Sequence, residues 1–163
     1  LERAQTVLRH PVAIRETSGT SRQADLIPDG LFGLEYRTAA GKRFRFFLIE
    51  ADRATEPLTS RQSNRKSVWR SFAQYQAYIE GGVYREHLAL TAPLLVLNVV
   101  TSEQRLQAMQ ELLIERFPRA AQYQLFRSWE TFGGIWRPTD PRIDLLTTPW
   151  QRAGHSPLAI ERP

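Results

Sequence analysis

The feature that most constrains the fold is an unbroken apolar segment in the second half of the chain, "PLLVLNVV" (93–100). Pro93 and the pair Thr101-Ser102 bound it, and a length of eight residues suits a strand better than a helix. A strand with apolar side chains on both faces has to be covered on both sides, as in the sheets of α/β proteins. We therefore expect residues 93–100 to form a central strand.

Two amphipathic helices are predicted next to this strand. In "SNRKSVWRSFAQYQAYIEGG" (63–82), the spacing of 4, 3 and 4 between apolar residues defines one helix face, formed by Val68, Phe72, Tyr75 and Ile79. Ser63 or Asn64 would begin this helix and Gly81-Gly82 would end it. In "SEQRLQAMQELLIERF" (102–117), Ser102 is the expected N-cap and Pro118 lies beyond the end.

The first helix is preceded by a predicted β-hairpin, in which residues 26–37 and 43–53 flank the turn "TAAGK". Placing its apolar residues side by side predicts a register with Tyr36 opposite Phe44, which would put Gly30 opposite Glu50. We also expect a short helix over 1–9, a polar loop from His10 to Ala24 and a strand in "YQLFRSWETF".

The predicted order α-β-β-α-β-α-β indicates an α/β fold, a mixed sheet flanked by helices and joined by right-handed crossovers. From Trp136 onward the chain carries half of its ten prolines. We therefore predict an α/β domain over residues 1–135 and a Pro-rich tail over 136–163 that packs on the domain or extends from it.

The composition of the chain limits the environments and the metal ions that it can be expected to contact. No apolar run is long enough to span a bilayer, so we expect a cytoplasmic protein without membrane contact. There is no cysteine, so a metal would be held by oxygen or His ligands, which favours Mg²⁺ or Mn²⁺. The chain does not begin with Met, and it is compatible with a fragment of a longer protein.

A net charge of +5 predicts DNA as a partner, because basic domains attract polyanions and guanidinium groups bind phosphate in a bidentate manner. Only Lys42 and Lys66 are lysines among 22 basic residues, so arginine carries the charge. An arginine-rich composition without DNA binding is the equally weighted alternative. The DNA-binding candidates lie in or just before the helix predicted within residues 63–82: Arg61, Arg65, Arg70, Gln74 and Tyr78.

Three carboxylates cluster around the hairpin. Side chains alternate along a strand, so Glu50 and Asp52 should point to the same face, and a bend at residues 28–30 would bring Asp29 to them. Three such carboxylates repel one another, and a divalent cation would relieve the repulsion. The alternative is that Asp29 is a turn residue and that the other two form ion pairs with nearby arginines, namely Arg37, Arg53 or Arg61.

Pro28-Asp29 followed by Glu50-x-Asp52 resembles the PD-(D/E)xK nuclease superfamily, which implies a restriction-endonuclease-like fold. More narrowly, "IPDG…FFLIEADRATEP" followed by "KSVWRSFAQYQAYIEGG" resembles the plasmid replication-relaxation family, over roughly residues 25–130. This second resemblance implies an N-terminal winged-helix domain that this chain lacks. The superfamily pattern implies a metal held by Asp29, Glu50 and the carbonyl of Ala51.

The superfamily usually has Lys where this chain has Asp52. That Lys steadies the charge that develops during cleavage. Lys66 could replace it from a helix stripe shared with Arg70, Gln74 and Tyr78, and Gln74-x-x-x-Tyr78 matches an element of RecB-like members. The alternative is a solvated polar face of an amphipathic helix.

Three functions remain open from the sequence. The first is a Mg²⁺- or Mn²⁺-dependent nuclease or nickase that acts on DNA in plasmid replication, relaxation or mobilisation. In it Asp29 and Glu50 bind the metal, Asp52 assists the metal, and Lys66 or an arginine stabilises charge. The second is a catalytically inactive DNA- or partner-binding module that retains the nuclease-like fold and acts in plasmid replication or the control of DNA relaxation. The third is a structural or homodimerising domain that uses the tryptophans, which are Trp69, Trp129, Trp136 and Trp150.

Overall fold

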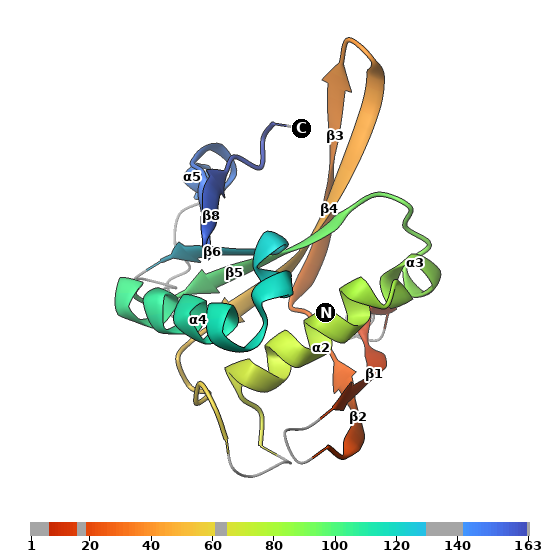
Figure 1. The fold of residues 1–163 in the computed structure, drawn as a ribbon. Helices are drawn as coiled ribbons and strands as arrows, with labels where there is room; N and C mark the ends of the chain where they lie inside the picture. The colour runs from red at the N-terminus through yellow and green to blue at the C-terminus, as the bar shows by residue number, and fades with distance from the viewer. Residues whose placement is uncertain (1–6, 16–18, 61–64, 130–141, 163) are drawn as a thin grey trace, which may run out of the picture.

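A computed structural model describes residues 7–15, 19–60, 65–129 and 142–162. Its main sheet has six strands in the spatial order β3-β4-β5-β6-β7-β8 (Figure 1). These are β3 (Gly30–Thr38), β4 (Gly41–Asp52), β5 (Leu94–Val100), β6 (Gln124–Ser128), β7 (Trp150–Arg152) and β8 (His155–Leu158). A second sheet pairs β1 (His10–Arg15) with β2 (Ser21–Leu26). The helices are α2 (Val68–Glu80), α3 (Val83–His87), α4 (Glu103–Arg116), the 3₁₀ helix η1 (Pro118–Gln122) and α5 (Asp144–Thr147).

The prediction of a central buried strand is confirmed, because β5 pairs in parallel with both β4 and β6. One face of the sheet packs on α2 and α4, where Val100 and Phe126 meet Phe72 and Leu113. On the opposite face, apolar residues of the inner strands pack against the C-terminal segment. The fold is therefore a mixed α/β sheet flanked by helices, as the order of elements predicted.

Both predicted helices form, with one change at a boundary. Helix α4 has the expected N-cap, in which the Ser102 hydroxyl accepts a hydrogen bond from the backbone N–H of Arg105 at 3.1 Å. Helix α2 begins at Val68 rather than after Ser63 or Asn64, because Ser67 is its N-cap. The N–H groups of Val68 and Trp69 donate to the carbonyls of Pro57 and Leu58, so they are unavailable to an earlier helical turn.

The β3–β4 hairpin is present, but its predicted register is wrong by one residue. Thr38 pairs with Gly41 across a two-residue turn, Tyr36 pairs with Arg43, and Gly30 pairs with Ile49. The turn decides the register, since Gly41 adopts φ +110 and the Thr38 hydroxyl donates to its carbonyl at 2.8 Å. Phe32 stacks on Phe47, with ring centroids 5.1 Å apart.

The predicted loop from His10 to Ala24 is wrong, because β1 and β2 form an antiparallel pair over most of it. Val12, Ile14 and Leu26 are buried against α2. The alternation of Val12 and Ile14 with polar or small residues is the strand signal in this segment. The predicted helix over 1–9 lies mostly outside the described residues, which include its last helical residues, Val7 and Leu8.

The Pro-rich C-terminal segment contributes strands to the main sheet. Strand β7 pairs with β6, and β8 pairs with β7. Trp150 and Ile160 are buried, and the Tyr36 hydroxyl donates to the Ile160 carbonyl at 2.6 Å. The predicted boundary between residues 135 and 136 lies outside the described residues. Within the described part of the chain, no helix has the length and apolar character to cross a membrane.

Candidate functional site

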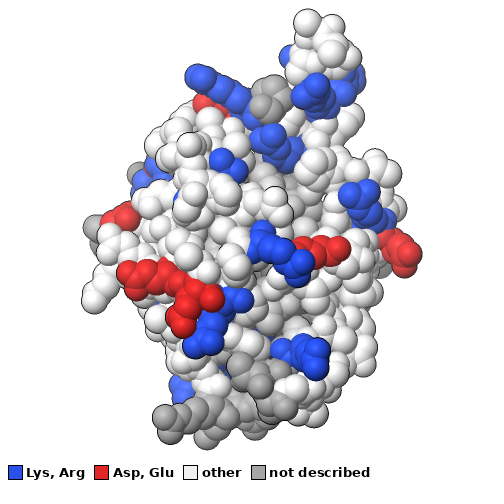
Figure 2. Space-filling model, viewed as in Figure 1, with Lys and Arg blue, Asp and Glu red and all other residues white. Residues whose placement is uncertain are grey.

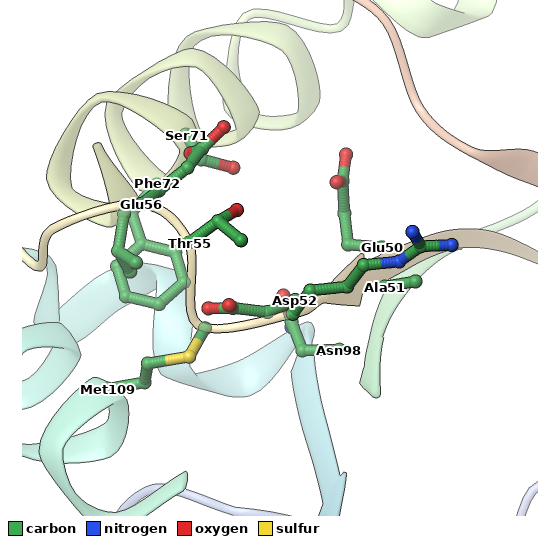
Figure 3. A pocket seen from close by; sticks show the side chains of 11 residues that line it. Glu50, Ala51, Asp52, Thr55, Glu56, Ser71, Phe72, Asn98 and Met109 are labelled. Atoms are coloured by element: carbon green, nitrogen blue, oxygen red, sulfur yellow. The ribbon is translucent and has the colours of Figure 1, made fainter. Parts of the chain in front are cut away.

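The C-terminal end of β4 forms one wall of a polar pocket of about 150 Å³ beneath α2. Glu50, Asp52 and Asn98 of the neighbouring strand β5 line it together, which confirms that Glu50 and Asp52 share a face of the sheet. Figure 3 shows the two carboxylates pointing in different directions within this pocket. Their shared face therefore does not by itself bring their oxygens together.

Glu50 is partly buried and accepts a short hydrogen bond from the hydroxyl of Tyr75, a fully buried residue of α2. Burial raises the pKa of Glu50 to about 8, and the nearby Asp29 carboxylate also raises it. The Tyr75 hydrogen bond and the charge of Lys66 act in the opposite direction. Without an added cation, Glu50 is thus mostly protonated at neutral pH, because its charged form is poorly stabilised.

Asp29 lies where β3 begins, at a bend in the chain. Because Gly30 pairs with Ile49, Asp29 is the next residue opposite Glu50. The Asp29 carboxylate accepts a hydrogen bond from the Ala51 N–H at 2.8 Å, and the Asp29 N–H donates to the Ile49 carbonyl at 2.9 Å. The structure thus brings Asp29 to Glu50, and the observed register does so more directly than the predicted one.

Asp52 is held by an arginine of α4. Its Oδ2 accepts hydrogen bonds from Arg105 Nε at 3.1 Å and Nη2 at 2.8 Å, and both side chains are largely buried, with 13% and 14% of their surface exposed. Asp52 Oδ1 accepts from the Ala54 N–H at 2.5 Å. Arg105 was not among the arginines predicted as partners. Asp52 therefore joins the end of β4 to α4, and its carboxylate points in a different direction from that of Glu50 (Figure 3).

The fit to a metal ion is partial. Among the described residues, no group of three or more His, Asp or Glu side chains is arranged to hold one. Two carboxylates with a backbone carbonyl nevertheless suit Mg²⁺, which usually keeps several waters and uses only one or two protein carboxylates. Asp29, Glu50 and the Ala51 carbonyl would supply such a set, and a cation there would favour the charged form of Glu50, whose pKa is raised by burial and by the Asp29 carboxylate.

Lys66 lies beside Glu50, although it is not part of a helix. It precedes the Ser67 cap, so the predicted helix stripe starting at Lys66 is wrong at its first member. Lys66 is exposed and lines a second, smaller pocket of about 70 Å³ together with Glu50, Arg70 and Gln74. Its charge lowers the pKa of Glu50, which agrees with a position close to that carboxylate.

Two of the predicted DNA-binding residues are buried. The Gln74 side-chain amide donates to the Ala24 carbonyl at 3.0 Å, and the Tyr78 hydroxyl shares a hydrogen bond of 2.8 Å with His87 Nδ1. They join α2 to β2 and α3, so the alternative of a solvated polar face is wrong at these positions. Arg65 is exposed and Arg70 is half-buried, and Arg61 lies outside the described residues.

A buried polar pair beside the pocket was not predicted from the sequence. Asn98 donates from Nδ2 to Gln124 Oε1 at 2.7 Å and to the Leu125 carbonyl at 3.1 Å. Asn98 is also the Cα partner of Glu50 across the parallel β4–β5 pair. An asparagine within an otherwise apolar strand was the signal for this pair, since buried polar groups need partners there.

The chain matches the family model described as replication-relaxation over residues 2–94. It belongs to the replication-relaxation family. The matched segment contains Asp29, Glu50, Asp52 and Lys66, whereas Arg105 lies beyond it. No curated protein and no solved structure matches the chain.

Proposed function

We propose that this replication-relaxation protein acts on DNA in plasmid replication or relaxation, and that it cleaves or nicks a phosphodiester bond with the help of Mg²⁺ or Mn²⁺. The observation that carries the proposal is the position of Lys66 beside the Asp29–Glu50 pair. Two carboxylates next to one ammonium group are the elements that a metal-dependent nuclease needs at the scissile phosphate. The PD-(D/E)xK resemblance supports the same reading.

Each residue of the site has a distinct role in this proposal. Asp29 and Glu50 would hold the cation together with the Ala51 carbonyl, and the chemistry that such a cation would supply is polarisation of the phosphate and activation of a water. Lys66 stabilises the charge that develops on the phosphate, replacing the usual lysine at the position of Asp52. Tyr75 orients Glu50 through its hydrogen bond, and Arg65 and Arg70 contact neighbouring phosphates.

Asp52 acts as a positioning residue in this proposal. Its ion pair with Arg105 holds the segment that follows β4, because Arg105 also donates to the Glu56 carbonyl at 2.8 Å. Glu56 lines both pockets with Glu50, so the same ion pair fixes the far wall of the site. Asp52 thus supports the geometry of the site without serving as a metal ligand.

A plasmid-nicking assay tests the proposal. The intact chain should convert supercoiled plasmid to open circles with Mn²⁺ and not with EDTA, and Glu50→Gln and Lys66→Ala should each reduce the rate at least 100-fold, in the range that a lost charge-stabilising group costs. Glu115→Gln and Arg116→Ala are matched controls, because they remove the same charges from an exposed ion pair at the end of α4. Nicking that is unaffected by Glu50→Gln would refute this site.

A second candidate function is a catalytically inactive module that binds DNA or a protein partner. Two contacts favour it, because the Asp52–Arg105 ion pair and the Glu50–Tyr75 hydrogen bond satisfy both carboxylates without a metal. Thermal unfolding separates the two functions. Under the first, Mg²⁺ or Mn²⁺ raises the melting temperature and Asp29→Asn removes the effect. An absence of any metal-dependent shift in the intact chain supports the inactive module.

A further inference from the structure

The outer half of the β3–β4 hairpin projects from the body of the protein (Figure 1). Strand β4 pairs with β5 only from Phe46 onward, so its first residues, 41–45, pair with β3 alone. Five residues at about 3.3 Å each give a projection of about 16 Å. We call residues 34–45 the basic arm.

The basic arm carries four cationic side chains and one carboxylate, a net charge of +3. Figure 2 shows Lys and Arg side chains gathered at this outer end of the molecule. Arg37 and Lys42 are 86% and 61% exposed, and Glu35 pairs with both. Arg43 is also exposed, and among the described residues it forms no ion pair. The arm therefore keeps an excess of exposed positive charge over Glu35, its one acidic residue.

The base of the arm is anchored, whereas its tip is exposed. Arg45 donates from Nη1 to the Arg162 carbonyl at 3.1 Å and lies 5.5 Å from the centre of the Tyr36 ring. The Tyr36 hydroxyl in turn donates to the Ile160 carbonyl. These contacts hold the two strands to the C-terminal segment. The arm is thus a two-stranded ribbon that is held at its base by the C-terminal segment.

The tip also exposes an aromatic side chain among its charges. Phe44 is 47% exposed and pairs across the hairpin with Glu35, on the same face as Arg37 and Lys42. Lysine and arginine alone would suffice to protect the free strand edges from pairing with another chain. An exposed phenylalanine does not serve that protection, and it gives the arm an apolar contact among its cations.

We propose that the basic arm enters the major groove of duplex DNA, with Arg37, Lys42 and Arg43 on the phosphates and Phe44 against a base edge. The major groove is about 12 Å wide and admits a two-stranded β-ribbon. Guanidinium and ammonium groups on the two sides of such a ribbon reach the flanking phosphates. The arm thereby anchors the DNA that the site at the other end of β4 acts on. This inference takes DNA as the partner from the proposed function, but it does not depend on cleavage.

Binding of a fluorescent 24-base-pair duplex, measured by anisotropy in EDTA across a salt series, tests the arm separately from cleavage. The double variant K42A/R43A should bind at least tenfold more weakly than the parent chain at 50 mM salt. Its log–log salt slope should be shallower by about 2, which corresponds to about two lost phosphate contacts. F44A should weaken binding several-fold without changing the slope.

The matched control is R116A/R119A, which also removes two exposed cations, here both ion-paired, but from the region of α4 and η1. It should bind within twofold of the parent. Equal losses in the two double variants, or unchanged binding by K42A/R43A, would overturn the proposal. So would equally tight binding to duplex RNA of the same sequence, whose major groove is too narrow for the ribbon. Circular dichroism checks that each variant is folded. Arm-dependent binding without cleavage would refute the proposed nuclease and leave the arm standing.

Discussion

Removing the ion pair between Asp52 and Arg105 should destabilise the protein, and the size of the loss shows how firmly Arg105 holds the Asp52 carboxylate. In Arg105→Ala, Asp52 loses two charge-assisted hydrogen bonds and keeps only the one from the Ala54 N–H. The segment after β4 also loses the bond from Arg105 to the Glu56 carbonyl. A carboxylate left largely buried without its cation typically costs about 3 to 5 kcal/mol.

The remaining exposure of the Asp52 side chain, 14%, allows water to reach it, and the retained Ala54 bond offsets part of the cost. We therefore expect Arg105→Ala to lower the free energy of unfolding by about 2 to 3 kcal/mol. For a chain of 163 residues this lowers the melting temperature by about 5 to 10 °C. Urea denaturation at pH 7 in EDTA measures the loss directly.

A double-mutant cycle separates the pair from its surroundings. Asp52→Ala combined with Arg105→Ala should cost less than the sum of the single variants by about 2 kcal/mol, because the double variant leaves no unpaired charge. The exposed pair Lys42–Glu35 is the control, with a coupling below about 1 kcal/mol. A loss under about 0.5 kcal/mol for Arg105→Ala, or no coupling, would mean that Arg105 does not hold Asp52 and that its carboxylate is available to a metal.

Two further predictions concern the pocket. Because the native state holds the Glu50 proton more tightly than the unfolded chain does, the associated stability is present at low pH and is lost as the pH rises through about 8. In EDTA the free energy of unfolding should fall by about 1 to 2 kcal/mol between pH 6 and 8, allowing for the partial exposure of Glu50. Glu50→Gln should remove this fall and Glu35→Gln should not, and a parallel fall in both variants would refute the assignment. Asn98→Leu should cost about 2 kcal/mol by leaving Gln124 unpaired, and Asn98→Leu with Gln124→Leu should recover part of it in the same denaturation assay. No recovery would show that the amide pair is not the cause.

The sheet and its covering helices could be predicted because their signals are local. The apolar run at 93–100 requires a strand covered on both faces, and the 4-3-4 spacing in α2 requires one buried helix face. Both signals depend only on which residues are buried, and the pattern of buried apolar residues repeats along the length of each element. These are the parts of the fold in which the prediction and the structure agree.

The register of the β3–β4 hairpin could not be obtained from apolar matching. Several registers bring large apolar residues together, and the choice was made by the two-residue turn before Gly41. The shift matters to the site, because it places Asp29 opposite Glu50. Strands β1 and β2 were missed for a related reason. Their buried residues are few and alternate with polar ones, so composition indicates a loop where alternation indicates a strand.

The residues that complete the site come from distant parts of the chain. Arg105 lies 53 residues after Asp52, and Asn98 is a single amide in a strand that is otherwise apolar. A spacing pattern on one strand cannot report such partners, since they depend on which helix crosses the strand end. The nearest sequence signal for Arg105 is its position after the Ser102 cap, which places it in the first turn of α4.

The charges around Glu50 bear on the proposed site, in which Asp52 stands where the PD-(D/E)xK superfamily usually has Lys. Asp29 and Glu56 both raise the pKa of Glu50, whereas Lys66 lowers it, so carboxylates outnumber ammonium groups there. A lysine at position 52 would have lain on the Glu50 face and reduced this excess. Asp52 instead carries its own cation in Arg105, and the two cancel, so neither contributes net charge to the pocket. In the proposed function, Lys66 would offset part of the excess at Asp29 and Glu50, and a bound divalent cation would offset the rest.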